Sequence, residues 1–199
     1  MTIPLAPRLH AKAWVTRYVI TPLARVLLVL HVPPNALTLA GLAVAAAAGY
    51  LLSEGHLLMG GIVMLAGASG DMLDGAVARL GNRVSRFGAF LDSAVDRLSE
   101  AVVFFGLLIY YVDQSHELGV YLSVGALVTS MMVSYLRARC ESLGVLADVG
   151  FMGRPERIVV LGVGLLTGYP LPALGAILGL ASLTVMQRVV HAARQMRDE

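Results

Sequence analysis

The sequence predicts an all-α integral membrane protein, with six transmembrane helices preceded by an N-terminal juxtamembrane amphipathic helix. Three observations support this fold class. The 199 residues are 57% hydrophobic and only 14% charged, and the mean hydropathy is +0.76, whereas soluble domains carry about 25% charged residues. The apolar residues form long stretches, and most of the basic residues lie in alternate connections between those stretches or towards the two ends of the chain.

Residues 1–33 are interpreted as an interfacial helix region. This segment alternates basic residues with Trp14, Tyr18 and Leu23, and it lacks the uninterrupted apolar core and the cleavage site of a signal peptide. Such a helix lies on the cytoplasmic leaflet, with a bend expected at Pro22. The alternative is an ordinary surface helix packed on the bundle.

Residues 34–199 are expected to form a six-helix bundle, and residues 1–199 a single membrane domain. The six apolar stretches cover residues 36–53, 57–70, 90–112, 118–136, 158–168 and 171–190. A helix needs about 20 residues to cross a bilayer. Two of the stretches therefore become long enough only if the neighbouring polar motif extends the helix.

The orientation follows from the Lys and Arg residues, which remain on the cytoplasmic side of a membrane. Most of them precede the first stretch, lie between the second and third or between the fourth and fifth, or lie at and after the end of the sixth. The other connections, "SEGH", "DQSHE" and "GYPLP", contain neither residue. Six spans then place both termini and the basic connections in the cytoplasm.

The composition also excludes some classes of function. The net charge of +2 is small, and no basic run is interleaved with aromatic residues, so nucleic acid is not an expected partner. Cys140 is the only cysteine, and an intrachain disulfide is therefore impossible.

Four aspartates stand out in the stretch "SGDMLDGAVARLGNRVSRFGAFLDSAVDRLSE", residues 69–100. Asp71 and Asp74 are three residues apart and Asp92 and Asp96 are four apart, so each pair shares one face of its helix. A short connection makes the two helices antiparallel neighbours, which brings their acidic ends together. Carboxylates in or near a membrane span are costly, and they therefore suggest a functional site.

Four converging carboxylates would repel one another unless cations held them ionised. Arginine side chains are one source of positive charge. Hard divalent ions are the other, and acidic groups from two helices can bridge a pair of Mg²⁺ ions, which favours a metal site.

Small residues lie on the same helix faces as the acids. Gly75 and Ala78 share the stripe of Asp74, and Gly88 shares the stripe of Asp92, which leaves room for a bulky ligand. Arg79 at the cytoplasmic mouth suits phosphate oxygens. These features favour phosphoryl transfer with a lipid-linked diphosphate. Close helix packing is the alternative for any small residue, and we expect it for five glycines elsewhere: Gly49, Gly60, Gly106, Gly125 and Gly162.

The residues assembled here read D-G-x2-A-R-x8-G-x3-D-x3-D from Asp74 to Asp96, with Asp71 three residues earlier. This pattern resembles, without a gap, the signature of the CDP-alcohol phosphotransferases. Eight fixed positions over 26 residues make the resemblance specific. The hydropathy profile of the whole chain is also similar to that family.

The resemblance implies a reaction in which an alcohol displaces CMP from a CDP-lipid. It assigns two divalent ions, usually Mg²⁺ with Mn²⁺ as an alternative, to Asp71, Asp74, Asp92 and Asp96. It also implies that Asp96 deprotonates the attacking hydroxyl. The implied contacts to the CDP-lipid are Asn35, Ala36, Leu37, Thr38, Gly75, Ala78, Arg79, Ser85 and Gly88.

Within the family, the motif region together with "SYLRARCESLG" and "RPERIVVL" looks most like the bacterial phosphatidylinositol phosphate synthases. These enzymes join CDP-diacylglycerol to inositol phosphate. The resemblance places the acceptor's phosphate at Arg137, Arg154, Arg157 and Arg188, and it implies a homodimer in the bacterial inner membrane. These arginines also exceed what topology requires, although snorkelling to lipid headgroups is the alternative.

Other functions stay open at this stage. Phosphatidylglycerophosphate synthase is the alternative within the family. A cation or proton transporter using the aspartates as a relay is an alternative from another class, and a catalytically inert membrane scaffold is a third. For Glu100 and Glu141, solvation or pairing with an arginine is favoured over a role beside the metal ligands.

Overall fold

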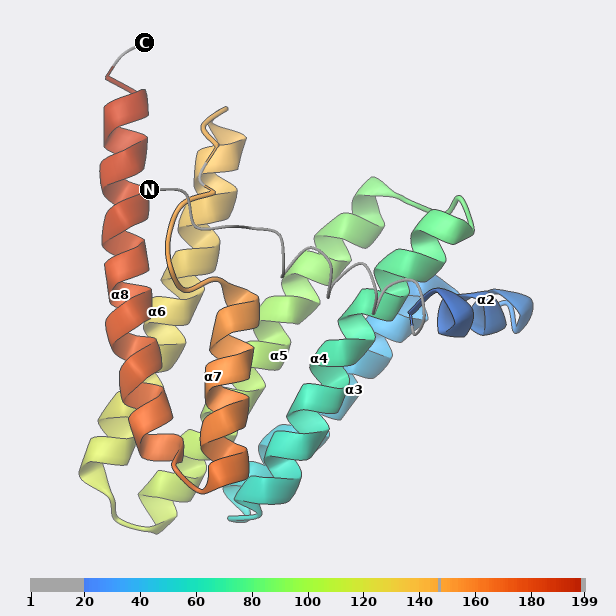
Figure 1. Cartoon of the computed structure of the whole chain (residues 1–199). Coiled ribbons are helices and arrows are strands. Elements are labelled where there is room, and N and C mark those ends of the chain that lie inside the picture. Colours follow the sequence, from blue (N-terminus) through green and yellow to red (C-terminus); the bar gives the residue numbers. More distant parts are fainter. Residues whose placement is uncertain (1–19, 147, 198–199) are drawn as a thin grey trace. The chain divides into compact units, whose positions relative to one another are not determined.

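The computed structural model describes residues 20–146 and 148–197, and its described side chains do not include those of Asp71 and Met72. Every secondary-structure element in this part of the chain is a helix (Figure 1). The helices are α2 (Thr21–Val29), α3 (Pro34–Ser53), α4 (Leu57–Leu80), α5 (Arg86–Asp113), α6 (Glu117–Ser142), α7 (Arg154–Thr167) and α8 (Pro170–Gln195). The all-α part of the predicted fold class is confirmed.

The predicted interfacial helix falls largely on residues 1–19, outside the described residues. Only α2 represents it, and Pro22 lies in the first turn of this helix. A proline is tolerated there because the first N–H groups of a helix have no intrahelical acceptor.

Prolines and glycines set several helix boundaries. α3 and α8 begin at Pro34 and Pro170, and Pro155 lies in the first turn of α7. α7 ends at Thr167 and is followed by Gly168, whose φ of 79° lies in the left-handed region that favours glycine. Most connections between the helices have two to five residues, as expected for a bundle, whereas residues 143–153 between α6 and α7 form a longer one.

Among the described residues, four helices are long and apolar enough to cross a membrane: α3, α4, α6 and α8. α4 continues through the polar motif to Leu80, which gives the short apolar stretch 57–70 the length that it needs. α5 has 28 residues but carries several charges in its first half. α7 has 14 residues, or about 21 Å, which is less than the roughly 30 Å of the hydrocarbon layer. Six spans therefore stay a prediction.

The chain forms two compact units. The first contains residues up to Ala43 and Gly67–Asp96, and the second contains Val44–Ala66 and Arg97–Glu199. In the first unit, α2 packs on α4 through Ile20, Ala24, Ala76 and Val77.

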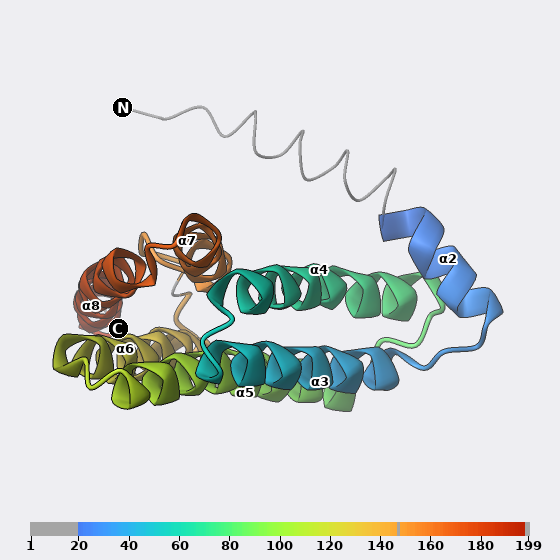
Figure 2. The ribbon, with the colours of Figure 1, turned by 90° about the horizontal axis from the view of Figure 1, so that it is seen from below.

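The second unit has the larger core, to which helices α3 to α8 all contribute. Leu52, Phe104, Leu107, Leu174 and Ile177 are almost completely buried in it. α8 lies alongside α6 and α7, as Figures 1 and 2 show from two directions.

Close packing at the five glycines is confirmed. A Cβ at Gly49, Gly60, Gly106 or Gly162 would lie less than 3.0 Å from a neighbouring atom, and one at Gly125 would lie 3.1 Å from Leu178. Small residues therefore allow these helices to approach closely.

Candidate active site

A cavity of about 280 Å³ lies in the first unit. The start of α3, the end of α4, the α4–α5 connection and the start of α5 surround it. Its lining residues are Pro34, Asn35, Thr38, Asp74, Gly75, Ala78, Arg79, Arg83, Val84, Ser85, Gly88, Ala89 and Asp92. The structure thus brings together most of the residues that the motif singled out.

Of the three predicted aspartates whose side chains are described, two line this cavity, one from each helix of the motif. Asp74 on α4 is only 7% exposed, and its Oδ2 accepts a hydrogen bond of 2.9 Å from the hydroxyl of Thr38. Asp92 faces the cavity from α5. The hydrogen bond fixes the orientation of a carboxylate whose burial would be costly without polar partners.

The side chain of Thr38 therefore bonds to Asp74 and also lines the cavity. Its hydroxyl also lies 3.3 Å from the carbonyl oxygen of Pro34. The sequence predicts Thr38 as a contact to the CDP-lipid. It gives no signal for the hydrogen bond to Asp74, because the two residues are 36 positions apart in the chain.

Ser85 caps the N-terminus of α5. The N–H of Gly88 donates a hydrogen bond of 2.9 Å to its Oγ, as an N-cap serine does for the third residue of a helix. A Cβ at Gly88 would lie 3.0 Å from this oxygen and 3.5 Å from Oδ1 of Asn35. The glycine therefore lets α3 and the α5 cap approach one another beside the cavity.

Arg79 folds back along α4 toward Gly75, four residues earlier. A Cβ at Gly75 would lie 3.2 Å from Nη1 of Arg79. The glycine gives the guanidinium room at the cavity wall. Arg83 also lines the cavity, although its position in the sequence indicates no more than the cytoplasmic orientation.

Some predicted residues lie elsewhere. Ala36 is exposed and Leu37 packs against the α2 cluster, because these positions face away from the side of α3 that carries Asn35 and Thr38. Asp96 is partly buried and is not part of the cavity lining. The Asp71 side chain lies outside the described ones, and the side chains that are described include no cluster of three His, Cys, Asp or Glu residues suited to a metal ion.

The acceptor arginines belong to the second unit. Arg188 on α8 is 5% exposed, and its Nε donates a hydrogen bond of 3.0 Å to the carbonyl oxygen of Val149. Its Nη1 donates to the carbonyl oxygen of Val133. Arg154, the first residue of α7, is partly buried.

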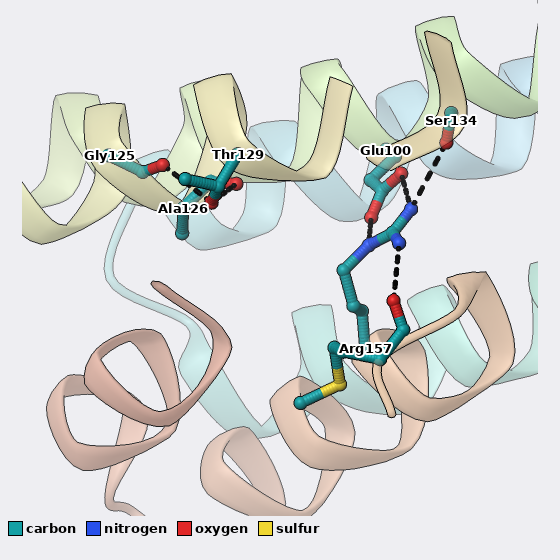
Figure 3. A network of polar contacts seen from close by, with 7 residues as sticks. Glu100, Gly125, Ala126, Thr129, Ser134 and Arg157 are labelled. Atoms are coloured by element: carbon teal, nitrogen blue, oxygen red, sulfur yellow. Dashed lines mark hydrogen bonds and ion pairs between the residues drawn. The ribbon is translucent and has the colours of Figure 1, made fainter. Parts of the chain in front are cut away.

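The two glutamates pair with arginines, as predicted. Arg137 on α6 is half exposed, and its Nε lies 2.9 Å from Oε1 of Glu141. Arg157 is only 1% exposed, and its guanidinium contacts both carboxylate oxygens of Glu100, at 2.6 and 2.8 Å (Figure 3). The charge of Arg157 is therefore compensated by a buried carboxylate.

Comparison with known proteins agrees with the motif. The sequence profile of the CDP-alcohol phosphatidyltransferase family matches residues 31–194. The chain belongs to this family. The resemblance inferred from residues 71–96 is confirmed, and the protein is a CDP-alcohol phosphatidyltransferase, a membrane enzyme of phospholipid biosynthesis.

Two curated relatives match most of the chain. The phosphatidylinositol phosphate synthase of Corynebacterium glutamicum is 38% identical over 187 residues, covering 88% of this chain and 84% of the relative. The archaetidylinositol phosphate synthase of Methanothermobacter thermautotrophicus is 38% identical over 171 residues, covering 83% and 85%.

Solved structures of the phosphatidylinositol phosphate synthase of Mycobacterium tuberculosis share the fold and 32% sequence identity. The structure with CDP-DAG bound has a TM-score of 0.81 and covers 87% of this chain and 93% of that chain. The complex with manganese and citrate has a TM-score of 0.82 and covers 87% and 88%.

Proposed function

We propose that this enzyme transfers the phosphatidyl group of CDP-diacylglycerol to a hydroxyl of inositol phosphate, releasing CMP and forming phosphatidylinositol phosphate. The main support is the cavity that the family motif lines, in a chain whose relatives are named for this product. The comparisons give no support to the transporter hypothesis. Phosphatidylglycerophosphate synthase remains the alternative within the family.

The CDP moiety is proposed to occupy the cavity of the first unit. Arg79 supplies a charged donor for diphosphate oxygens, and the Ser85 hydroxyl can donate while its oxygen accepts from Gly88. Gly75 and Gly88 have no side chains to fill the cavity at their positions. Ala36 and Leu37 do not line the cavity, and they are proposed to contact only the acyl chains of the CDP-lipid or the residues beside them.

The donor set of the cavity fits a hard divalent cation. Asp74 and Asp92 present carboxylate oxygens from two helices to one space, and such oxygens are the ligands that Mg²⁺ and Mn²⁺ prefer. We propose that Asp71 and Asp96 complete the site, which holds two ions. A bound pair of divalent ions would neutralise the diphosphate and the charge that develops on CMP.

Asp96 is proposed as the general base. It takes the proton of the acceptor hydroxyl, whose oxygen then attacks the phosphorus of the phosphatidyl group. A new phosphorus–oxygen bond forms, and the bond to the CMP oxygen breaks. The products are phosphatidylinositol phosphate, CMP and a proton on Asp96.

The phosphate of the acceptor is proposed to bind Arg137, Arg154, Arg157 and Arg188. Arg188 is held by two backbone carbonyls, and a fixed guanidinium suits a phosphate better than a mobile one because less entropy is lost on binding. Arg157 is 1% exposed, and its guanidinium pairs with Glu100.

Purified protein with CDP-diacylglycerol and Mg²⁺ is expected to release CMP when inositol phosphate is added. The decisive measurement is CMP release with a panel of polyol phosphates that includes glycerol 3-phosphate and unphosphorylated inositol. We expect inositol phosphate to give the highest kcat/KM. CMP release with glycerol 3-phosphate alone would assign the chain to the alternative within the family.

We further propose six membrane spans, with α5 and α7 as the third and fifth, both termini and the cavity on the cytoplasmic side, and a homodimeric assembly. The connections at Asn82 and Gln114 then lie on opposite sides of the membrane. In a chain with Cys140 replaced by Ala, Gln114→Cys in intact cells is expected to react with an impermeant maleimide, and Asn82→Cys only after permeabilisation. Equal labelling of both positions in intact cells would contradict this topology.

A further inference from the structure

A second cavity lies in the second unit, at the C-terminal end of α8. Its volume of about 420 Å³ is within the range of small-molecule sites. The last turns of α8 form one wall, where this helix continues beyond the start of α7 (Figure 1), and the α6–α7 connection forms the other. The described lining residues are Val149, Gly150, Met186, Gln187, Val190, His191 and Arg194. They include none of the four arginines proposed for the acceptor, so this cavity is a separate site.

His191 joins the two walls of this cavity. Its Nε2 lies 3.0 Å from the carbonyl oxygen of Leu146, and because a carbonyl oxygen can only accept, Nε2 carries the proton and donates it. Three residues further along the connection, the carbonyl oxygen of Val149 accepts from Arg188. Two side chains of α8 therefore hold the connection in place beside the cavity.

The polar groups of the cavity suit an anion that also carries hydroxyl groups. Arg194 is exposed and supplies a positive charge, while no Asp or Glu is among the described lining residues. The adjoining Asp148 has a side chain that is 90% exposed and lies 3.9 Å from Nη2 of Arg137. A phosphate can therefore accept hydrogen bonds from Arg194 without a competing carboxylate in the lining.

Gln187 contributes an acceptor that has no donor. Its Oε1 is buried and has no hydrogen-bond partner within the part of the chain that the structure describes. A buried acceptor without a partner costs free energy. Because Gln187 lines the cavity, rotation of its amide can present this oxygen to a ligand, and a ligand hydroxyl would then supply the donor.

The position of the cavity along α8 matches the surface of a bilayer. α8 begins at Pro170, and the roughly 20 residues that cross the hydrocarbon layer then end near Val189. His191 and Arg194 lie beyond this point, at the level of lipid headgroups. Met186 and Val190, at the other end of the cavity, are exposed apolar side chains. A ligand with an anionic head and an apolar tail therefore matches the cavity better than a soluble anion does.

We propose that this cavity binds the headgroup of an anionic phospholipid, with its phosphate at Arg194 and a headgroup hydroxyl at Gln187. The acyl chains lie along Met186 and Val190. Phosphatidylglycerol has this chemistry, whereas the trimethylammonium group of phosphatidylcholine would be repelled by Arg194. The bound lipid takes no part in phosphatidyl transfer, and it holds the α6–α7 connection against α8. The inference goes beyond the proposed function and holds for any acceptor.

The test measures binding of short-chain phosphatidylglycerol to the purified wild type and to three variants by native mass spectrometry. Arg194→Gln removes the charge in the cavity, and Gln187→Leu removes the unpaired amide oxygen. Arg197→Gln is the matched control, because Arg197 is exposed three residues further along the chain and does not line the cavity. Lipid bound in the CDP-lipid cavity is common to all four proteins and cancels in the comparison.

Arg194→Gln is expected to weaken the binding of phosphatidylglycerol by about 10-fold, which is the effect of one charge-assisted hydrogen bond. Arg197→Gln is expected to bind like the wild type. Gln187→Leu should weaken binding by about fivefold, the effect of a neutral hydrogen bond, and should raise the unfolding midpoint of the lipid-free protein because a buried unpaired acceptor is removed.

Two further measurements locate the lipid and identify its source. Phosphatidylglycerol should slow hydrogen exchange of amides 149 and 150 in the wild type and in Arg197→Gln, and more weakly in Arg194→Gln. Inorganic phosphate also suits the arginines proposed for the acceptor, so its binding should be the same in the wild type and in Arg194→Gln.

Unchanged affinity for phosphatidylglycerol in either cavity variant would overturn the inference. Equal losses in Arg194→Gln and Arg197→Gln would also overturn it, since they would mean a general attraction of lipid to a basic chain end. The same holds if Arg194→Gln weakens the binding of phosphatidylcholine or of inorganic phosphate as much as that of phosphatidylglycerol. Failure of the proposed function is a different result, the absence of CMP release with inositol phosphate in the wild type.

Discussion

Asp92→Asn is expected to reduce CMP release by about a thousandfold or more while the protein remains folded. Asp92 lines the cavity from α5 opposite Asp74 on α4, and we propose that both bind divalent ions. An amide is a poorer ligand than a carboxylate, and a metal contributes several kcal/mol of transition-state stabilisation, which corresponds to this loss of rate. Initial rates at saturating CDP-diacylglycerol and inositol phosphate measure the effect.

The matched control is Asp113→Asn. Asp113 is the last residue of the same helix and is exposed, so turnover should stay at the wild-type value. A second measurement separates metal binding from catalysis. Mn²⁺ should raise the melting temperature of the wild type and of Asp113→Asn, but not that of Asp92→Asn, because a ligand stabilises only a fold that binds it. Full activity in Asp92→Asn would refute the metal proposal and favour the inert scaffold.

The helices were largely predictable because hydropathy and Pro or Gly punctuation are local signals. α3 begins two residues before its apolar stretch, at Pro34, and α6 begins one residue before its stretch, at Glu117. α7 was harder, since its apolar stretch starts at residue 158 whereas the helix starts at Arg154. Charged residues continue a helix when their side chains find partners, and Arg157 finds Glu100.

The face-sharing residues of the site were also predictable from the 3.6-residue repeat. Gly75 and Ala78 line the cavity with Asp74, and Gly88 lines it with Asp92. The periodicity of α3 could have excluded Ala36 and Leu37, because of the four predicted residues 35–38 only Asn35 and Thr38 line the cavity. The contact of Thr38 with Asp74 joins residues that are 36 positions apart in the chain, and that of Arg157 with Glu100 joins residues 57 positions apart. They depend on tertiary packing, for which a single sequence has no signal.

Gly106→Ala is expected to destabilise the protein, whereas Gly179→Ala is expected to stabilise it slightly. A Cβ at Gly106 on α5 would lie 2.2 Å from the carbonyl oxygen of Gly49 on α3 and 2.9 Å from its Cα. Both atoms belong to the backbone and cannot rotate away, so the two helices must separate. Overpacking of this kind costs about 1–3 kcal/mol, and the lost interhelical contacts add to that cost.

Gly179 on α8 has no atom within 4 Å of an added Cβ. Alanine there gains about 0.5–1 kcal/mol, because it loses less backbone entropy than glycine when a helix forms. The thermal unfolding midpoints of the two variants in one detergent should therefore shift in opposite directions. Shifts of the same sign would mean that α3 and α5 do not approach at Gly49 and Gly106, since helix propensity alone would then explain both substitutions.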